Sequence, residues 1–529
     1  MAELFPGGVL DLLDAAGDRP VFEHADRVVS GAGLLASVRR AANGLRKHGV
    51  GPGDGVAVLL GVSPEAFAAI TAAHVVGARV VGVRPGLTER QQNHLLADVA
   101  FRVTERADGR AAPPAGSGGA TGGRATSRNA PADDRRPAER LALDDLLSAA
   151  DDGAPPRVTA RPQDIARLIH TSGSTGVPKA CTQTYAAMTA AWTLRPDDWP
   201  PAIRELAARL DRFLVFGTLA SQVMMEYGLL TLAAGGTLVT ADPPAFPDAL
   251  VRHRATAGVI TVARLAKLVA SQRDSPVDLS GLRALMVSGS PMEPGRLREA
   301  ADVLGPVVFH GYGQTETGTI SMATPADEPG SLGVPPVDLE VRDPSGRPVP
   351  PGADGELYVR TPSQSTGYWR EPALTAEVFT DGWVRTRDLG HLDAGGRLWL
   401  TGRTRDVIIV NANLYYAGPI ERLLATDPAV AEAYVVAVPD DDTGESAHAF
   451  VVPAAGHAPD LGALRALVAA NLGRACAPTR LTLIEEVPLT PAGKPDKRRL
   501  AAGGDQGDVR HGPQGVFRKS RRPPDFREL

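Results

Sequence analysis

Short apolar runs, separated by longer amphipathic segments, recur along most of the chain. In the first hundred residues an apolar run covers residues 56–60, an amphipathic segment opens at Pro64 and Glu65, and a second apolar run covers residues 79–83. Continuous apolar runs predict buried strands, and the segment between them predicts a helix. Strand, helix and strand in this order predict a parallel sheet covered by helices.

The same alternation of apolar runs and amphipathic segments continues further along the chain. Between Arg167 and Arg360 helical segments separate the apolar runs "FLVFG", "GTLVTA", "AGVITV", "LRALMVSG" and "PVVFHGYG". The pattern then changes to short strands and hairpin turns, in "GELYVR", "DGWVRTRDLGHLD" and "GRLWLTGR". We therefore expect an α/β fold: a large N-terminal domain of parallel-rich sheets with helices, together with a small β-structured subdomain.

A smaller unit begins at about Asp406. It contains two predicted strands, "DVIIV" and "AYVVAVPD", a helix that opens near Gly418 and Pro419, and a second helix in "LGALRALVAANLG". This mixture predicts a small α+β C-terminal domain.

Two segments lack the large apolar residues that a folded core needs. Residues 106–140 are rich in Gly, Ala, Pro, Ser and Arg, and residues 501–529 form a basic end. Such segments bury too little surface to offset the entropy of ordering, so we predict a disordered loop and a disordered tail.

Length, charge and cysteine content narrow the function classes. The 529 residues exceed the roughly 250–300 that one core serves, so more than one domain is expected. A net charge of -5 gives no electrostatic reason to expect nucleic acid or a membrane surface. The 2 cysteines indicate neither a disulfide framework nor a zinc site. Without a signal peptide or an apolar run of roughly 20 residues, we expect a cytoplasmic, monomeric or homodimeric enzyme that acts on small molecules.

The segment "HTSGSTGVPKACTQTY" (170–185) is the first candidate for chemistry. Gly173 and Gly176 let backbone N–H groups converge on an anion, and Lys179 adds a positive charge. The hydroxyl donors are Thr171, Ser172, Ser174 and Thr175. These residues suit a polyphosphate, but the spacing is neither a Walker A motif nor a Rossmann fingerprint. On this segment alone, a plain turn between two elements stays an alternative.

Four further segments carry isolated polar candidates. "FHGYGQTETG" combines an aromatic ring, Tyr312, with Thr315 and Glu316. It therefore offers a surface for a base and an oxygen ligand for Mg²⁺. Asp388, Arg403 and Lys494 lie in "TRDLGHLD", "TGRTRD" and "LTPAGKPDKRRL". Each of these residues taken singly is common at protein surfaces and turns.

The ordered set of motifs is more informative than any one of them. "TSGSTGVPK", "HGYGQTE", "GSLGVP", "GELYVR", "GYWREPALTAEVFTDGWVRTRDLG", "GRTRDVI" and "LTPAGKPDKRRL" follow one another between Gly49 and Leu500. In this order they resemble the adenylate-forming superfamily of acyl-CoA synthetases, peptide-synthetase adenylation domains and luciferases. The resemblance implies that a small-molecule carboxylate attacks ATP to give an acyl adenylate and pyrophosphate. A thiol of CoA, or of a carrier protein's phosphopantetheine, then displaces AMP.

The resemblance also implies a role for each matching residue. Residues Thr171 to Lys179 would hold the β- and γ-phosphates, Thr315 would contact the α-phosphate, and Glu316 would ligate Mg²⁺. Residues lining the adenine would be Gly289, Ser290, Gly311 and Tyr312, and those holding the ribose would be Asp388 and Arg403. Lys494 would be the catalytic lysine, since charge that develops on the α-phosphate is stabilised by a positioned ammonium group. A mobile C-terminal domain (404–500) would rotate against the N-terminal domain (1–403) about a hinge at Arg405.

The chain departs from the family pattern at several positions. Ala180 stands where a glycine is usual, and Arg387 replaces the glycine of T-G-D. After the hinge, Ile409 and Ala412 stand where lysine and glycine are usual, close to the expected path of the pantetheine thiol. An added methyl group hinders close approach of a backbone, so Ala412 disfavours passage of the pantetheine thiol.

The acid and its acceptor therefore have alternatives. We predict a medium-sized aryl or alkyl acid, lined by Phe216, Met224 and Met225 of "FLVFGTLASQVMMEYG". The acceptor is CoA in the leading hypothesis. Alternatives are a carrier protein, an amine, and the activation of nitrite for aryl-amine diazotisation in secondary metabolism. A last alternative is a catalytically inactive acyl-binding homologue.

Overall fold

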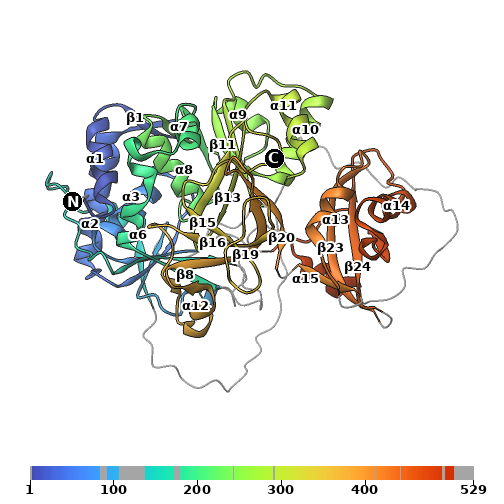
Figure 1. Cartoon of the computed structure of the whole chain (residues 1–529). Coiled ribbons are helices and arrows are strands. Elements are labelled where there is room, and N and C mark those ends of the chain that lie inside the picture. Colours follow the sequence, from blue (N-terminus) through green and yellow to red (C-terminus); the bar gives the residue numbers. More distant parts are fainter. Residues whose placement is uncertain are drawn as a thin grey trace, which may run out of the picture.

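The computed structural model describes residues 3–83, 92–93, 95–105, 138–171, 179–241, 244–289, 292–404, 406–410, 413–440, 443–490 and 495–504. Within these ranges the strands form two large sheets and two five-stranded sheets. Figure 1 shows the large sheets and their helices on one side and the C-terminal elements, in orange and red, on the other. Every helix in the described ranges is too short or too polar to span a bilayer.

The first large sheet confirms the predicted strand, helix, strand unit. Its strands are β3 (Gly55–Leu59), β4 (Arg79–Gly82), β5 (Phe101–Thr104), β6 (Glu139–Ala142), β7 (Ile165–Thr171), β8 (Lys179–Thr184) and β17 (Gly367–Tyr368). Strands β3 to β7 pair in parallel, and β8 pairs antiparallel with β7. Helix α3 (Pro64–Val75) connects β3 to β4 and begins where Ser63 accepts a hydrogen bond from Ala66 N at 3.0 Å.

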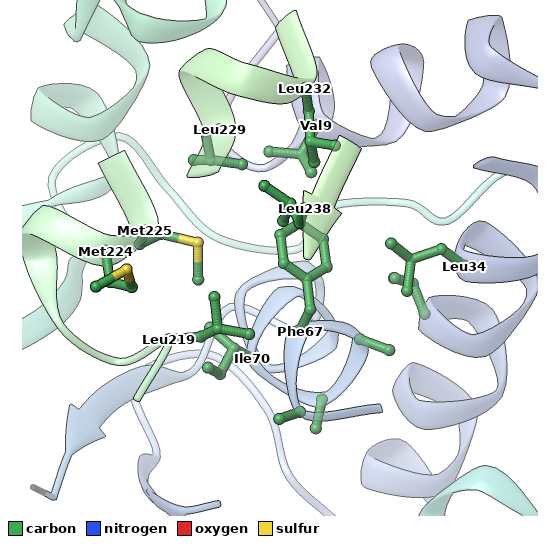
Figure 2. Close-up of a cluster of buried hydrophobic side chains, with 14 of the residues drawn as sticks. Val9, Leu34, Phe67, Ile70, Leu219, Met224, Met225, Leu229, Leu232 and Leu238 are labelled. Atoms are coloured by element: carbon green, nitrogen blue, oxygen red, sulfur yellow. The ribbon is translucent and has the colours of Figure 1, made fainter. Parts of the chain in front are cut away.

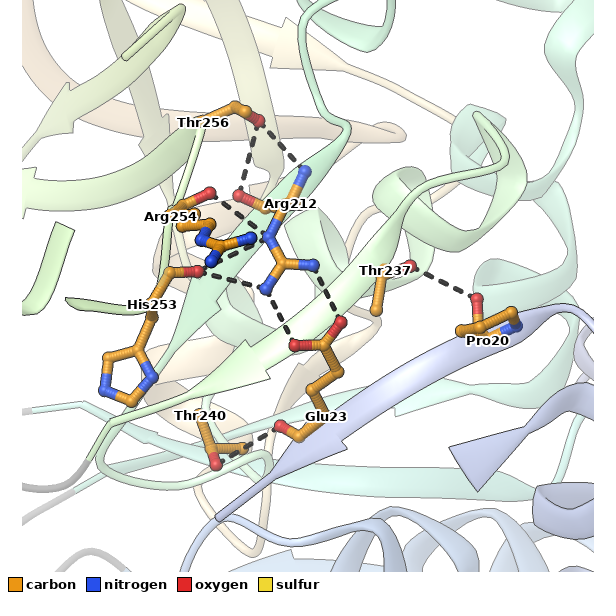
Figure 3. Close-up of polar contacts among 8 residues, drawn as sticks. All are labelled: Pro20, Glu23, Arg212, Thr237, Thr240, His253, Arg254 and Thr256. Carbon is orange, nitrogen blue, oxygen red and sulfur yellow. Dashed lines mark hydrogen bonds and ion pairs between the residues drawn. The ribbon is translucent and has the colours of Figure 1, made fainter. Parts of the chain in front are cut away.

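The second large sheet contains all five apolar runs predicted after Arg167. Its strands are β1 (Pro20–His24), β2 (Arg27–Ser30), β9 (Arg212–Val215), β10 (Thr237–Thr240), β11 (Ala257–Thr261), β12 (Ala284–Ser288), β13 (Val308–Gln314) and β14 (Gly318–Ala323). A bidentate ion pair, Arg212 with Glu23 at 2.7 Å for both contacts, joins the central strand β9 to β1 (Figure 3). Because β10 lies between β9 and β1 in the sheet, this pair spans one intervening strand.

Helices fill the space between the sheets and cover their outer faces. They are α1 (Gly7–Ala16), α2 (Gly31–Lys47), α5 (Leu143–Leu147), α6 (Tyr185–Ala190), α7 (Pro201–Ala207), α8 (Gln222–Ala233), α9 (Asp248–Arg252), α10 (Val262–Asp274), α11 (Pro294–Leu304) and α12 (Pro372–Val378). Helix α3 is buried at every position except Glu65, and it contacts both β4 and β1. A helix that is apolar on all sides is stable only inside a core. In Figure 2, Phe67 and Ile70 of α3 accordingly face Met225 and Leu229 of α8.

The two smaller sheets follow in chain order. The first consists of β15 (Asp338–Arg342), β16 (Gly355–Arg360), β18 (Phe379–Thr380), β19 (Trp383–Leu392) and β20 (Leu398–Arg403). The second consists of β21 (Val407–Val410), β22 (Asn413–Tyr416), β23 (Val430–Asp440), β24 (Gly444–Pro453) and β25 (Arg480–Leu483), with helices α13 (Ala417–Leu424), α14 (Leu461–Leu472) and α15 (Lys497–Gly504). Its buried side chains form a separate cluster, from Ile408 to Cys476.

One lysine ties the last helix to the start of this C-terminal sheet. Lys497 Nζ lies 2.8 Å from Asp406 Oδ2 and 2.7 Å from Glu421 Oε1. These two carboxylates raise the pKa of Lys497, although burial alone would lower it. The ammonium group therefore connects α15 both to the residue after the predicted hinge and to α13.

Both segments predicted as disordered contain residues with regular secondary structure at one end. Strand β6 includes Glu139 and Arg140, because it pairs along its length with β5 while Leu141 and Ala142 are buried. Helix α15 continues to Gly504, because Leu500 and Ala501 pack with Val436. The rest of both segments lies outside the described residues.

Candidate active site

A buried carboxylate, Asp388 of β19, connects three side chains from two strands. Its Oδ2 accepts hydrogen bonds from Tyr312 OH at 2.7 Å and from Gln314 Nε2 at 2.6 Å. Its Oδ1 lies 2.8 Å from Arg403 Nε of β20. Burial and the neighbouring Asp388 charge raise the pKa of Tyr312, and Asp388 also raises the pKa of Arg403. Tyr312, Asp388 and Arg403, assigned above to the adenosine, therefore form one hydrogen-bonded group.

A second carboxylate, Glu316, lies two residues after Gln314 and contacts a different strand. Tyr368 OH donates a hydrogen bond to Glu316 Oε1 at 2.6 Å. On the other side, Lys179 Nζ lies 5.5 Å from the centroid of the Tyr368 ring. Burial and the Glu316 charge raise the pKa of Tyr368 well above its usual range. Tyr368 thus brings the end of the predicted phosphate loop close to the predicted magnesium ligand.

The pairing of two strands that are far apart in the sequence produces this contact. Residues Gly367 and Tyr368 of β17 pair with Thr182 and Cys181 of β8. Ser365, just before β17, donates its backbone N–H to Glu316 O at 2.8 Å and its hydroxyl to Thr315 O at 3.2 Å. Sequence reasoning gave no role to Gln314, Ser365 or Tyr368, although "GYW" and "GQTE" were among the quoted motifs.

The turn that carries Thr315 and Glu316 requires a glycine. Strands β13 and β14 approach closely at a register shift next to Gly313. A Cβ atom at Gly313 would collide with the carbonyl oxygen of Gly318. Glycine therefore lets the two strands close tightly, which leaves Thr315 and Glu316 at the tip of the hairpin.

The remaining predicted nucleotide residues are described only in part. Thr171 ends β7, Gly289 follows β12 with a φ of 102°, and Gly311 lies within β13. Residues 172–178, which include Ser172, Gly173, Ser174, Thr175 and Gly176, lie outside the described residues, as do Ser290, Arg405, predicted as the hinge, and Lys494, predicted as the catalytic lysine. Their roles stay predictions.

Arg387, beside the buried Asp388, has a backbone conformation that favours glycine. Its φ is 61°, and its guanidinium group lies 2.6 Å from Glu377 Oε1. Its carbonyl oxygen accepts hydrogen bonds from Thr404 N at 2.9 Å and from Thr404 Oγ1 at 3.2 Å. The strained residue is therefore held directly by the last residue before the predicted hinge.

This conformation predicts an unusual order of stability. We expect Arg387→Gly to be more stable than Arg387→Ala by about 1 kcal/mol, because only alanine keeps the left-handed strain while both lose the ion pair. Urea unfolding of the two variants measures the difference. Equal stabilities, or a more stable alanine variant, would contradict the assigned strain.

A cavity of about 30 Å³ lies beside helix α8. Met225 lines it, together with Leu219 and Ile70, and Figure 2 shows these three side chains close together. The other two predicted pocket residues are placed elsewhere. Met224 is buried in the main core, and Phe216 packs edge-on against Phe246 with ring centroids 6.0 Å apart.

Sequence reasoning missed two ionisable side chains that line this cavity, Arg167 of β7 and His74 of α3. Burial lowers the pKa of Arg167 to about 10, although the charge of Glu226 on α8 acts against the shift. Burial and the Arg167 charge lower the pKa of His74 to about 3. His74 is therefore neutral in the folded protein at neutral pH.

The depressed pKa of His74 predicts acid sensitivity. Below pH 6.5 the unfolded chain binds a proton at His74 that the folded chain does not, so stability falls as the pH falls towards 3. Between pH 6.5 and 5 we expect His74 to contribute a loss of about 2 kcal/mol. Urea unfolding of wild type and His74→Leu at both pH values isolates this contribution as a change in their difference. A difference independent of pH would contradict the prediction.

Comparison with known proteins shows the family to which this chain belongs. The model of the AMP-binding enzyme family matches residues 13–369, and that of the AMP-binding enzyme C-terminal domain matches residues 419–494. The chain belongs to the AMP-binding enzyme family. The resemblance to the adenylate-forming superfamily and the expected α/β architecture, with a large N-terminal and a small C-terminal domain, are thereby confirmed.

Relatives of this AMP-binding enzyme differ in what their names say they make. Feruloyl-CoA synthase from an Amycolatopsis species is 33% identical over 487 residues, covering 89% of this chain and 93% of the synthase. Indoleacetate–CoA ligase from Aromatoleum aromaticum is 32% identical over 509 residues, covering 90% and 94%. The structure of the amide bond synthetase McbA from Marinactinospora thermotolerans superimposes with a TM-score of 0.79 at 33% identity, covering 94% of this chain and 99% of McbA. These relatives share the adenylate-forming ligase class, but their names indicate different acceptors.

Proposed function

We propose that this enzyme activates a carboxylic acid with ATP and transfers the resulting acyl group to the thiol of CoA. The observation that carries the proposal is the set of contacts from Lys179 through Tyr368 to Glu316 and, two residues earlier at the end of strand β13, from Gln314 to Asp388. It joins groups suited to phosphate, to a divalent cation and to a ribose along one strand end.

Two bond exchanges make up the proposed reaction. A carboxylate oxygen bonds to the α-phosphorus, and the bond from this phosphorus to the bridging oxygen breaks, which releases pyrophosphate. The CoA sulfur then bonds to the acyl carbon, its proton is lost to solvent, and the bond to AMP breaks. No general base is needed for the first step, because a carboxylate is ionised at neutral pH.

The residues present fit ATP with Mg²⁺. Mg²⁺ is typically held by one or two carboxylates together with substrate phosphates, and Glu316 supplies one carboxylate at the hairpin tip. Lys179 places a cation near the same side chain, through the Tyr368 ring. The Asp388 carboxylate is suited to accept hydrogen bonds from ribose hydroxyls if a ribose hydroxyl replaces Tyr312 or Gln314 as a donor. Bound Mg²⁺ would supply charge neutralisation on the phosphates.

We propose an aromatic acid as the substrate. Apolar side chains dominate the cavity beside α8, and Met225 adds an adaptable wall. The relatives at 32% and 33% identity are named for feruloyl and indoleacetate groups. A flat, mostly apolar acid suits both observations.

A second acceptor, an amine, has its own support. The amide bond synthetase shares 33% identity over nearly its whole length. In the sequence, Ala412 also replaces the glycine expected where pantetheine passes. A narrower passage disfavours a long thiol arm and leaves a small amine unaffected.

Pyrophosphate release tests both steps. We expect release that depends on an aromatic acid, and faster turnover when CoA is added. Mass spectrometry then identifies the product as a thioester or, with an added amine, as an amide. An amide formed at a higher rate than any thioester would replace CoA by an amine, and absence of release with every acid would reject adenylation.

A further inference from the structure

The cavity beside α8 is lined by polar as well as apolar side chains, and one polar atom, Nδ1 of His74, is buried without a partner among the described residues. Arg167, His74 and Thr71 line it, among side chains such as Phe5, Val9 and Leu229. Buried polar groups are usually hydrogen-bonded, because an unpaired one costs about 1–3 kcal/mol. Unpaired groups facing a cavity therefore favour a ligand that pairs with them.

Arg167 uses little of its hydrogen-bonding capacity. Its Nε donates to Gln183 Oε1 at 2.6 Å, and Gln183 in turn donates to Ser363 O at 2.8 Å. This is the one hydrogen bond from the Arg167 guanidinium group to another described residue. Its two terminal nitrogens, which form the end of a rigid planar fork, keep their donors for another group.

The Arg167 charge is balanced without direct contact. Glu226 lies in the interior and its charge stabilises the charged form of Arg167, but no ion pair joins these two described side chains. Glu226 Oε1 instead accepts a hydrogen bond from Thr319 Oγ1 at 3.1 Å. The negative charge of Glu226 disfavours a second anion beside Arg167, so a neutral polar group fits better.

His74 offers an acceptor to the same cavity. Its side chain is 3% exposed, and its Nδ1 has no hydrogen-bond partner in the described part of the protein. Phe5 and Tyr185 pack against the imidazole edge-on, with ring centroids at 5.1 and 5.8 Å. The ring is thus held in place, and with its proton on Nε2 the neutral imidazole accepts a hydrogen bond at Nδ1.

The cavity lies at a suitable place for the far end of the acid. Leu168 and Ile169, which also line it, precede Thr171 and the predicted phosphate loop. Glu226 is bonded to Thr319, which pairs with Gly313 across the hairpin that carries Glu316. An acid whose carboxylate lies near this hairpin tip, and whose body follows α8, points its opposite end towards Arg167.

We propose that the aromatic acid carries a hydroxyl group at the end opposite its carboxylate, and that Arg167 and His74 bind this hydroxyl. Its oxygen accepts from the Arg167 guanidinium group, and its O–H donates to His74 Nδ1. A cavity of about 30 Å³ holds a hydroxyl group, since one water needs about 10–15 Å³ by the same measure. The inference rests on the proposed acid activation.

Two matched series of acids test this specificity. Pyrophosphate release is measured with ring-hydroxylated (meta and para), unsubstituted and para-carboxylated forms of both benzoate and cinnamate. We expect kcat/KM for a hydroxylated acid to exceed that of its unsubstituted partner by about 100-fold or more. Equal values, or preference for the dicarboxylate, would overturn the inference but leave acid activation standing. No release with any acid would instead reject the proposed function.

Variants assign the preference to Arg167. Arg167→Met should lower kcat/KM for the hydroxylated acid to the value of the unsubstituted one, with KM for ATP unchanged, and Arg167→Lys should restore part of the preference. Arg167→Met/Glu226→Gln removes both charges, so it should fold better than Arg167→Met and still lack the preference. Arg212→Met breaks an ion pair on a distant strand and should keep the preference for the hydroxylated acid. Equal loss for both acids in the Arg167 variants would overturn the assignment.

Discussion

Replacement of Lys494 by alanine is expected to lower acid-dependent pyrophosphate release by about 100- to 1000-fold, the range for losing one preorganised electrostatic contact. The reason is that negative charge grows around the α-phosphate while the carboxylate attacks. A positioned ammonium group stabilises this charge at no cost of reorganisation. The second step removes AMP from an existing adenylate, so the same variant should still form thioester from added acyl adenylate and CoA.

Arg499→Ala is the matched control for this experiment. Arg499 is exposed on α15, the helix that follows Lys494, so its loss should affect neither step. Single-turnover measurements of the two half-reactions separate the outcomes. If Lys494→Ala lost both half-reactions equally, Lys494 would not be specific to adenylation.

Replacement of Asp388 by alanine is expected to lower both stability and affinity for ATP. Three donors would lose their acceptor, and Arg403 would keep a charge without its partner. Since Arg403 is partly exposed, we expect a loss of about 3 kcal/mol, the lower end for breaking a buried pair. Loss of a charged acceptor for the ribose should raise KM for ATP by about 10- to 100-fold.

Glu356→Ala separates these two effects. Glu356 forms a bidentate ion pair with Arg385 in the same sheet, at 2.7 and 2.8 Å. Its loss should lower stability without raising KM for ATP. Urea unfolding and ATP titrations of both variants provide the comparison. An unchanged KM in Asp388→Ala would remove Asp388 from the nucleotide site.

Sequence patterns predicted the strands well, because buried strands must be apolar whatever their neighbours are. Residues 56–60 and 79–83 match β3 and β4 to within one residue at each end. The motifs also predicted the grouping of Tyr312, Asp388 and Arg403 in one site, because their order along the chain resembles a known family. The strand patterns are local in the sequence, and the family resemblance depends only on the order of the motifs.

Sequence patterns could not predict contacts between strands that are far apart in the sequence. Tyr368 reaches Glu316 only because β17 pairs with β8, and no periodicity indicates this pairing. Arg167 lies between apolar residues of its strand, and Glu226 lies in a largely apolar helix. Each looks like an isolated irregularity until the fold brings the two charges close together.

The Lys497 contacts with Asp406 and Glu421 bear on how movement of the C-terminal domain can be observed. These contacts connect α15 to the residue before β21 and to helix α13. A fluorophore on α15 would therefore report the position of the whole C-terminal sheet. Paired with a second fluorophore on the exposed end of α2, it makes energy transfer a direct readout of domain rotation. In Lys497→Met the same label would instead report local fraying of one helix.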